Sequence, residues 1–587
     1  MLSEELRIDE PFTALAALRA QEGPDATAFT YVDYSADRHG VARSLSWAEL
    51  DRRSRDLAAV LVSRGFTPGT RAAILVPQGL DYVVSFLGAL HAGLIAVPLF
   101  APGLLGNAAR LTGALRDSAP EVWLTTADAA GDVRAIADEG VVPAPAAVLA
   151  VDALGPAPSG VELPEVAASD IAYLQYTSGS TRSPAGAVIT HANVVANARQ
   201  ALTAVGVRPG DTMVSWLPLF HDMGLVLTIA APIAGGVGSV FIDPFAFVQR
   251  PLRWLRLLAE HPGAVSAAPN FALDLTAERV TPEERRALDL GGVRAVLNGS
   301  EPIRAATIER FLATFAESGL RPEALRPAYG LAEATVFVTV SPRDESTRIT
   351  AFDRDALSTG HAVPVPPGTD AASLYVACGG PVGQEIRIVD PKSSREMPEG
   401  DVGEIWVRGP NVAHGYWMGG IRSDDTFGGR VAAPLDDPLA PIDGGWLRTG
   451  DLGLLHRGQL YITGRHKDLI IVDGRNHYPQ DIEVTAQHAH PAVRRDRVAA
   501  FGAVTDGQEG VVVVAEHSRH VAEHERDPGD VAQAVRAAVT AGHDVHLHDF
   551  VLVPPGKVPR TSSGKIARAA ARTRYLEGGF AAAGEVS

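Results

Sequence analysis

A run of small polar residues follows an apolar, strand-like segment that ends near Tyr176. Backbone N–H groups and hydroxyls in such a loop can surround a polyphosphate, and glycine lets the backbone approach a ligand closely. No Lys-Ser or Lys-Thr pair follows the second glycine, so this is not the common phosphate-binding loop of nucleoside triphosphatases. Taken alone, the segment also fits an ordinary Ser/Gly turn. The residues of the candidate loop are Thr177, Ser178, Gly179, Ser180 and Thr181.

Four further motifs follow the loop in a fixed order. They read Tyr-Gly-Leu-Ala-Glu at 329–333, Arg-Thr-Gly-Asp at 448–451, Gly-Arg-His-Lys-Asp at 464–468 and Pro-Arg-Thr-Ser-Ser-Gly-Lys at 559–565. Together the five motifs resemble, over essentially the whole chain, the superfamily of acyl-CoA synthetases, peptide-synthetase adenylation domains and luciferases. The resemblance implies an enzyme that joins a carboxylic acid to AMP from ATP.

Within that superfamily the chain is most similar to the fatty acyl-AMP ligases, which pass the acyl group to an acyl carrier protein. The phosphate loop has Arg182 and Ala185 where relatives usually have Gly and Lys, and the segments 215–224 and 330–335 match this subfamily. The separation between Glu333 and Cys378 is longer than in acyl-CoA synthetases. The surplus falls in 341–373, where acyl-AMP ligases resemble one another in carrying an insertion. If this insertion braces the C-terminal domain, it would obstruct the pose that coenzyme A needs.

The resemblance also assigns the central charges of the site. Attack of a carboxylate on the α-phosphorus of ATP brings two anions together, so catalysis depends on positioning and charge neutralisation. Glu333 is implied as the Mg²⁺ ligand, since this ion bridges phosphate oxygens and takes one or two carboxylates. Lys565 is implied to reach both the attacking carboxylate and the α-phosphate as a mobile point charge. The alternatives are a solvated or helix-capping Glu333 and a surface Lys565 in a basic tail.

Further implied assignments concern the nucleotide. Asp451 would accept hydrogen bonds from the ribose hydroxyls, and Arg465 would assist on the same sugar. Tyr329 would stack on adenine, although ordinary packing of its ring is the alternative. Ala332 stands where most relatives have Thr, so one phosphate-binding hydroxyl is absent. The other residues placed around the adenine are Asn298, Gly299, Ser300 and Gly330.

Two assignments concern orientation and movement. By resemblance, His221 lies between the nucleotide and the acyl pocket and would orient the carboxylate, but a structural histidine is nearly as good an interpretation. Lys467 and Asp468 fall at the junction about which relatives rotate a small C-terminal domain, and hinges are often a few residues at the ends of elements. No zinc site is expected, because the histidines lack metal-ligand spacing and the chain has one cysteine.

These motifs require a scaffold of alternating elements. Positions 72–76 predict a strand, 82–91 a helix and 95–99 a strand, and similar alternation continues through 264–268. Such a pattern predicts an α/β fold with layered, largely parallel sheets, and a small β-rich subdomain completes an N-terminal adenylate-forming domain at 1–464. Strands at 511–516 and 550–553 with a helix near 531–539 predict a small α+β domain at 465–587, and the resemblance implies that it is a mobile cap. Segments near 128–170 and 341–373 are loop-like in composition.

Composition limits the partners and the location. The 587 residues carry a formal net charge of −17, which disfavours nucleic-acid binding and means that an acidic carrier protein would need a local basic patch. The uncharged stretch 223–242 is long enough to span a bilayer, but Pro232 and three glycines interrupt it, so we expect no integral membrane segment. The acidic N-terminus lacks a signal-peptide pattern, and the lone Cys378 fits a reducing compartment. We therefore expect a cytoplasmic protein.

The expected function is activation of a medium- or long-chain fatty acid with ATP and Mg²⁺. Transfer to an acyl carrier protein of a polyketide or non-ribosomal peptide pathway would follow. A long-chain fatty acyl-CoA synthetase is the first alternative and shares the first step. A catalytically inactive scaffold that binds acyl chains or nucleotides is the second, which intact Glu333, Asp451 and Lys565 disfavour. An amino-acid adenylation domain is weaker, since no carrier-protein Ser motif follows Lys565.

Overall fold

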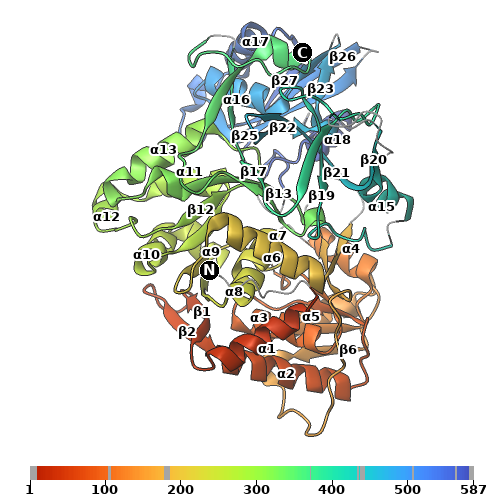
Figure 1. Ribbon diagram of the computed structural model, residues 1–587. Coiled ribbons are helices and arrows are strands. Elements are labelled where there is room, and N and C mark those ends of the chain that lie inside the picture. Colours follow the sequence, from red (N-terminus) through yellow and green to blue (C-terminus); the bar gives the residue numbers. More distant parts are fainter. Residues whose placement is uncertain are drawn as a thin grey trace.

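The molecule consists of a large body and a small unit stacked on it (Figure 1). The structure, a computed structural model, describes residues 9–103, 108–176, 185–369, 372–418, 420–432, 435, 443–472, 474–505, 508–561 and 565–580. In Figure 1 the chain runs from red at the bottom through green in the middle to blue at the top. We call the described residues from Arg465 onwards the C-terminal unit and those before it the body.

The first sheet of the body is mostly parallel, as the alternating pattern predicts. Its order is β6-β5-β3-β4-β7-β8, and among these pairs β7–β8 is antiparallel. Apolar side chains of β3, β4 and β5 are fully buried, which agrees with a parallel sheet covered on both faces. The elements are β3 (Arg71–Ile74), α3 (Leu80–His91), β4 (Ile95–Pro98), α4 (Ala108–Ser118), β5 (Val122–Thr125), α5 (Ala130–Asp138), β6 (Ala147–Ala150), β7 (Ile171–Tyr176) and β8 (Gly186–Thr190).

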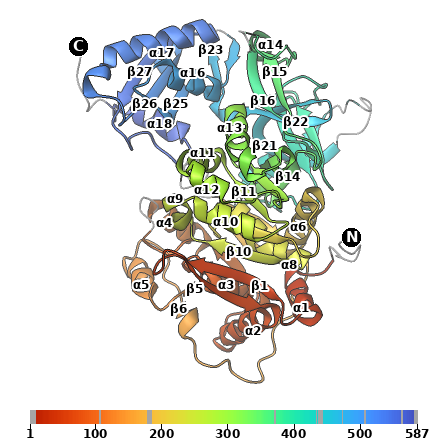
Figure 2. The same ribbon diagram turned by 90° about the vertical axis from the view of Figure 1, so that its left-hand side faces the viewer.

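The second sheet has the order β17-β14-β13-β12-β11-β9-β10-β1-β2 and carries most of the site. It is parallel from β1 through β10, β9, β11 and β12 to β13, and it becomes antiparallel at both edges. Figure 2 shows helices α10, α11 and α12 along one side of this layer. The elements are β1 (Thr27–Asp33), β2 (Val41–Ser46), α6 (His191–Val205), β9 (Thr212–Ser215), β10 (Gly238–Ile242), α10 (Leu252–Glu260), β11 (Val265–Ala268), α11 (Asn270–Arg279), α12 (Pro282–Arg286), β12 (Ala295–Asn298), α13 (Ala305–Phe315), β13 (Leu325–Gly330), β14 (Phe337–Val340) and β17 (Gly380–Pro381).

The uncharged stretch 223–242 folds into helix, turn and strand. Helix α7 (Asp222–Leu225) continues through a π-helical turn (Val226–Ala230) into α8 (Ala231–Gly235), and β10 follows. Gly236 provides the left-handed turn with φ 62°. No helix within the described ranges combines the length and hydropathy that a bilayer crossing needs.

Both segments predicted as loops contain regular structure, so that prediction is wrong in part. The first holds α5 and β6. The second holds β15 (Ile349–Asp353) and α14 (Arg354–Ser358), and β15 pairs with β16 (Ala372–Val376) in an antiparallel ribbon. The composition of this segment did not indicate the short strand 349–353, because the strand is completed by pairing with β16 at the far end of the insertion.

An antiparallel sheet forms the small β-rich part of the body, as predicted. Its order is β18-β19-β21-β20, and β22 pairs with β21. The long strand β21 brings Asp451 opposite Arg465, the last residue of β22. The elements are β18 (Glu385–Val389), β19 (Gly403–Arg408), β20 (Gly429–Val431), β21 (Asp443–His456) and β22 (Gln459–Arg465).

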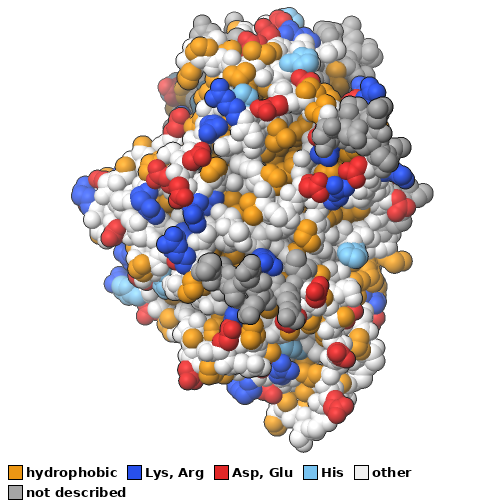
Figure 3. Space-filling view, in the orientation of Figure 1, with side chains coloured by type: hydrophobic (Ala, Val, Ile, Leu, Met, Phe, Trp, Pro, Cys, Tyr) orange, Lys and Arg blue, Asp and Glu red, His pale blue; other side chains and the backbone are white. Residues whose placement is uncertain are grey.

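The C-terminal unit is α+β, as predicted, and has its own apolar core. Its sheet has the order β25-β26-β27, and helices α16 and α17 pack together beside it. On the face of the whole molecule seen in Figure 3, acidic and basic side chains are intermingled. The elements are β23 (Ile470–Val472), β24 (Arg475–His477), α16 (Pro479–Ala489), β25 (Val493–Thr505), β26 (Gln508–His517), α17 (Pro528–His543), β27 (Leu547–Val553) and α18 (Arg568–Leu576).

Candidate active site

The predicted adenine-binding residues lie at the ends of two neighbouring parallel strands. Asn298 ends β12, and Tyr329 and Gly330 end β13, so they meet at one edge of the sheet, where ligands of open α/β sheets bind. The Asn298 amide donates to the Ala268 carbonyl at 2.9 Å, while its buried Oδ1 has no partner among the described residues. Ser300 adopts φ 75°, an uncommon conformation for a non-glycine residue and one that concentrates at functional sites.

Two glycines of these motifs cannot carry a side chain. A Cβ on Gly330 would lie 1.7 Å from the Val336 carbonyl oxygen, and one on Gly299 would lie 2.7 Å from the Ala328 carbonyl oxygen. Glycine is therefore needed at both positions because a backbone carbonyl approaches closely. This is one of the two usual reasons for glycine, the other being an unusual backbone dihedral angle. The structure gives this reason for two residues that the sequence assigned to the nucleotide only by resemblance.

Asp451 is held from two sides. The Tyr329 hydroxyl donates to one carboxylate oxygen at 2.8 Å, and Arg465 Nε donates to the other at 3.0 Å. The side chain of Asp451 is only 10% exposed, and its charge raises the pKa of Arg465 against the effect of burial. Each carboxylate oxygen keeps a free lone pair, so the group can still accept hydrogen bonds from a ribose. The Tyr329 ring is almost fully buried in an apolar cluster, and its stacking on adenine stays a prediction.

A tyrosine that lies in none of the five sequence motifs orients Glu333. The Tyr416 hydroxyl donates to Glu333 Oε1 at 2.7 Å, and Ala413 N–H binds the Glu333 carbonyl at 2.9 Å. Thr335, two residues on, has φ 66° and is fixed by its hydroxyl bond to the Asn411 carbonyl at 2.7 Å. The bond to one carboxylate oxygen thus aligns the Glu333 side chain. A carboxylate held in this way is a suitable ligand for a hard cation that also binds phosphate oxygens and water.

The predicted phosphate loop, Thr177 to Thr181 with Arg182, lies outside the described residues. Its two ends are described, and they are paired: Tyr176 lies opposite Gly186 in the β7–β8 ladder. Gly186 accepts the Trp417 N–H at 2.7 Å, and Ala187 forms a bridge with Tyr416. The strand residues that follow the loop therefore lie beside the segment that carries Tyr416, the tyrosine that binds Glu333.

His221 contacts a carboxylate that the sequence analysis did not single out. Its Nδ1 lies 2.6 Å from Asp222 Oδ1 at the start of α7. Burial opposes ionisation of Asp222, but the charges of His221 and Lys565 leave the pKa of Asp222 below its ordinary value. His221 is a partner of an ionised carboxylate, so both earlier interpretations, orientation of a substrate and a structural role, agree with this contact.

Lys565 reaches the body from the C-terminal unit. Its loop is closed at the base, because Thr561 N–H binds the Lys565 carbonyl at 2.8 Å and Arg560 bridges to Ile566. Burial lowers the pKa of Lys565, and the charges that oppose this most strongly are those of Asp222 and then Glu301. The structure therefore brings Lys565 together with acidic groups at the edge of the second sheet.

The two predicted hinge residues lie in a short 3₁₀ turn, His466–Asp468. Asp468 accepts a bond from Arg568 Nη1 at 3.4 Å within the C-terminal unit. Burial lowers the pKa of Lys467, and the charges of Asp468, Asp451 and Glu333 counteract this effect. Rotation about this turn stays a prediction.

Comparisons with known proteins decide the family. The sequence profile of the AMP-binding enzyme family matches residues 17–417, and that of the AMP domain of Disco-interacting protein 2-like proteins matches 467–584. The chain belongs to the AMP-binding enzyme family. It is 45% identical to the long-chain-fatty-acid–AMP ligase FadD26 of Mycobacterium marinum, over 97% of this chain and 98% of the relative.

Solved structures agree with this membership of the AMP-binding family. A structure from a study of fatty acyl-adenylate ligases of E. coli and L. pneumophila matches with a TM-score of 0.86 and 34% identity, covering 98% of this chain and 99% of that one. The fatty acyl-adenylate ligase of L. pneumophila in complex with acyl adenylate and pyrophosphate matches with a TM-score of 0.74 and 32% identity, covering 98% of both chains. The predicted fold class, the resemblance to fatty acyl-AMP ligases and the adenylate-forming ligase activity are confirmed, and enzymes of this kind use ATP.

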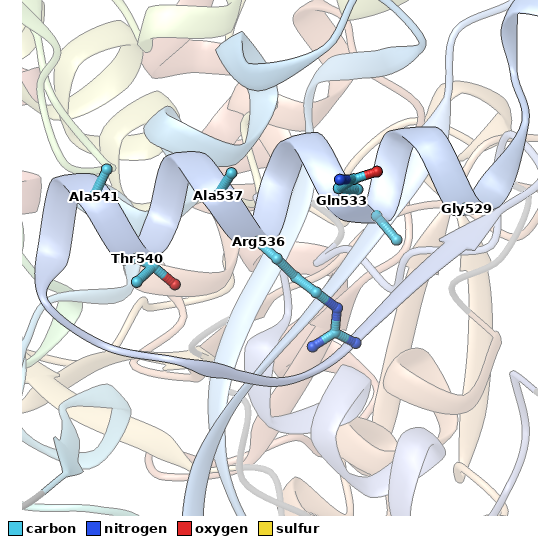
Figure 4. A pocket seen from close by; sticks show the side chains of 7 residues that line it. Gly529, Gln533, Arg536, Ala537, Thr540 and Ala541 are labelled. Atoms are coloured by element: carbon cyan, nitrogen blue, oxygen red, sulfur yellow. The ribbon is translucent and has the colours of Figure 1, made fainter.

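A surface hollow elsewhere contains none of the predicted site residues. It runs along α17 and is lined by Gly529, Ala532, Gln533, Arg536, Ala537, Thr540 and Ala541 (Figure 4). Figure 4 shows the lining side chains spaced along a single helix, with Arg536 as the one charged group among them. We assign it no part in the reaction.

Proposed function

We propose that this AMP-binding enzyme is a fatty acyl-AMP ligase that activates a long-chain fatty acid and then transfers it to an acyl carrier protein. The observation that supports the proposal is that Lys565, which comes from the C-terminal unit, is buried and interacts electrostatically with Asp222, Glu301 and Asp451 of the body. A cation delivered into a site of this kind suits a reaction between two anions.

In the first step a fatty carboxylate oxygen bonds to the α-phosphorus, and the bond from that phosphorus to the bridging oxygen of pyrophosphate breaks. Lys565 would neutralise charge on the carboxylate and on the α-phosphate oxygens. Asp451, oriented by Tyr329 and Arg465, would bind the ribose. Glu333, oriented by Tyr416, would hold Mg²⁺, which when bound neutralises charge on the phosphates.

The insertion at 341–373 supports the choice of carrier protein over coenzyme A. Arg354 at its short helix donates to the Gly542 carbonyl at the end of α17. Asp355 pairs with Arg475 at 2.9 Å, and Tyr375 of β16 binds Asp481 of α16 at 3.3 Å. These contacts tie the C-terminal unit to the body in this arrangement and would hinder its rotation toward the pose that serves coenzyme A. The cytoplasmic location expected from the sequence stays a prediction.

The experiment is to incubate the enzyme with ATP, Mg²⁺ and a panel of fatty acids, offering no acceptor, coenzyme A or a phosphopantetheinylated carrier protein. We expect pyrophosphate release with long-chain acids and acyl transfer to the carrier protein alone. A variant shortened within 346–371 should keep acyl-AMP formation and gain some acyl-CoA. Efficient acyl-CoA formation by the unaltered enzyme would contradict the proposed acceptor, and no pyrophosphate release with any acid would contradict the first step.

A further inference from the structure

One arginine of the body forms ion pairs on both sides of the junction with the C-terminal unit. Arg304, the residue before α13, places Nη2 2.9 Å from Asp274 Oδ2 in α11. Its Nη1 pairs with Asp496 Oδ1 in β25. The three side chains are partly buried, at 29%, 12% and 33% exposure for Arg304, Asp274 and Asp496. Such pairs are screened less by salt than exposed ones and contribute more to a defined geometry.

Both carboxylate partners of Arg304 are themselves fixed. Asp274 also accepts the Thr307 hydroxyl at 2.9 Å and pairs with Arg310. Asp496 adopts φ 58° at an irregular point of β25, and its N–H binds Gln487 Oε1 of α16 at 3.0 Å. A non-glycine residue keeps such a conformation only where its surroundings hold it. The cross-junction pair therefore joins two rigid positions.

The pair lies next to the chemistry. Glu301, three residues before Arg304, accepts the Phe271 N–H at 3.3 Å. Burial raises the pKa of Glu301, and the two largest opposing charges are Arg304 and Lys565. On the other side, Arg497 follows Asp496 and is a close electrostatic neighbour of Arg560, at the base of the Lys565 loop. Asp496 is thus the sequence neighbour of an arginine that interacts electrostatically with the base of the Lys565 loop.

We infer that Arg304 and Asp496 form a latch that holds the C-terminal unit in the arrangement where Lys565 enters the site. Both are positioning residues, since they act on the reaction through the placement of Lys565. The latch must open for any step that uses another arrangement of the C-terminal unit. The inference concerns acyl-AMP formation. Only the part of the test that measures transfer to the carrier protein rests on the proposed acceptor.

The test compares Arg304→Gln, Asp496→Asn and the double variant, with Arg310→Gln as the matched control. Arg310 pairs with the same Asp274 but forms no hydrogen bond or ion pair with the C-terminal unit among the described residues. We expect each single variant to lower kcat for ATP–pyrophosphate exchange about tenfold with KM for ATP unchanged, and the double variant to lower it no further. Arg310→Gln should stay within about twofold, and transfer from preformed acyl-AMP to the carrier protein should not slow in any latch variant.

Hydrogen exchange provides a readout that does not depend on turnover. Amides around 494–499 should exchange faster in Arg304→Gln than in the Arg310→Gln control, with the rest of the C-terminal unit unchanged. Additive losses in the double variant, an equal loss in the control, or unchanged exchange around 494–499 would each overturn the latch. Absence of carrier-protein transfer in the unaltered enzyme would instead count against the proposed acceptor.

Discussion

Asp451 and Glu333 each receive hydrogen bonds from protein groups that orient them before any nucleotide arrives. The Tyr329 and Arg465 donors fix Asp451, and the Tyr416 hydroxyl fixes Glu333. Preorganised charges of this kind need no reorientation when charge develops in the reaction, which is where their catalytic value lies.

Replacing Tyr416 by Phe should weaken use of the metal and the triphosphate. The change removes the bond to Glu333 Oε1 and leaves the ring in place, and loss of such a partner costs about ten- to a hundredfold in metal affinity or activity. We expect the Mg²⁺ concentration for half-maximal pyrophosphate release to rise by about tenfold. Tyr31→Phe, in β1 and outside the site, is the control. An unchanged Mg²⁺ requirement in Tyr416→Phe would contradict the assignment of Glu333 as a Mg²⁺ ligand.

Acyl-AMP formation should be lost at high pH earlier than an ordinary lysine would allow. Burial lowers the pKa of Lys565, and the reaction needs the charged form, which is present below that pKa and disappears as pH rises through it. The basic limb of kcat/KM for acyl-AMP formation should therefore fall below the usual lysine value of about 10.4. A basic limb that is unaffected in Lys565→Arg, which stays charged, would argue that another group titrates.

The resemblance to the superfamily predicted roles for Asp451, Arg465 and Lys565, because each stands in one of its motifs, and these roles stay predictions. Asp222, inside the quoted segment 215–224, and Glu301, directly after Ser300, were missed because their electrostatic interaction with Lys565, far away in sequence, carries no sequence signal. Tyr416 gave no sequence signal beyond its type. Its bond to Glu333 depends on a bridge between β8 and the segment after β19.

At the scale of elements, the alternating pattern predicted several strands and helices of the two mostly parallel sheets, among them β3, α3, β4 and β11, because fully buried strands and amphipathic helices leave strong local signals. The insertion was different. Its strand β15 pairs with β16 across a stretch rich in proline and glycine, and only this distant pairing makes a strand of 349–353. Contact of the insertion with α16 and α17 could not be read from either segment alone.

The contact between the insertion and α16 should make stability depend on pH. Burial raises the pKa of Asp481 to about 6, above its unfolded value, so its contribution to stability is full below about pH 4 and is lost as pH rises through 6. Relative to Asp481→Asn, the unfolding free energy of the unaltered protein should fall by about 2 kcal/mol over this range. Urea unfolding at pH 4.5 to 7.5 measures the difference, and Asp355→Asn serves as an exposed control. A pH-independent difference would contradict the burial of Asp481 against Tyr375.

At the scale of the whole molecule, two units contribute residues to the candidate site. The body carries Glu333, Asp222, Glu301 and Asp451, and the C-terminal unit carries Lys565, which interacts electrostatically with Asp222, Glu301 and Asp451. The ordered motifs predicted that this lysine would act from a separate domain. The arrangement that brings it into the site depends on pairs such as Arg304–Asp496, whose partners are remote in sequence and carry no motif.

The central claim is that Lys565 acts on the nucleotide held by the body, and single-turnover formation of acyl-AMP tests it most directly. The comparison is between Lys565→Ala and Lys557→Ala, an exposed lysine of the same segment. We predict that Lys565→Ala slows acyl-AMP formation by about a hundredfold or more with little change in ATP affinity, while Lys557→Ala keeps the unaltered rate. Equal rates in the two variants would contradict the account.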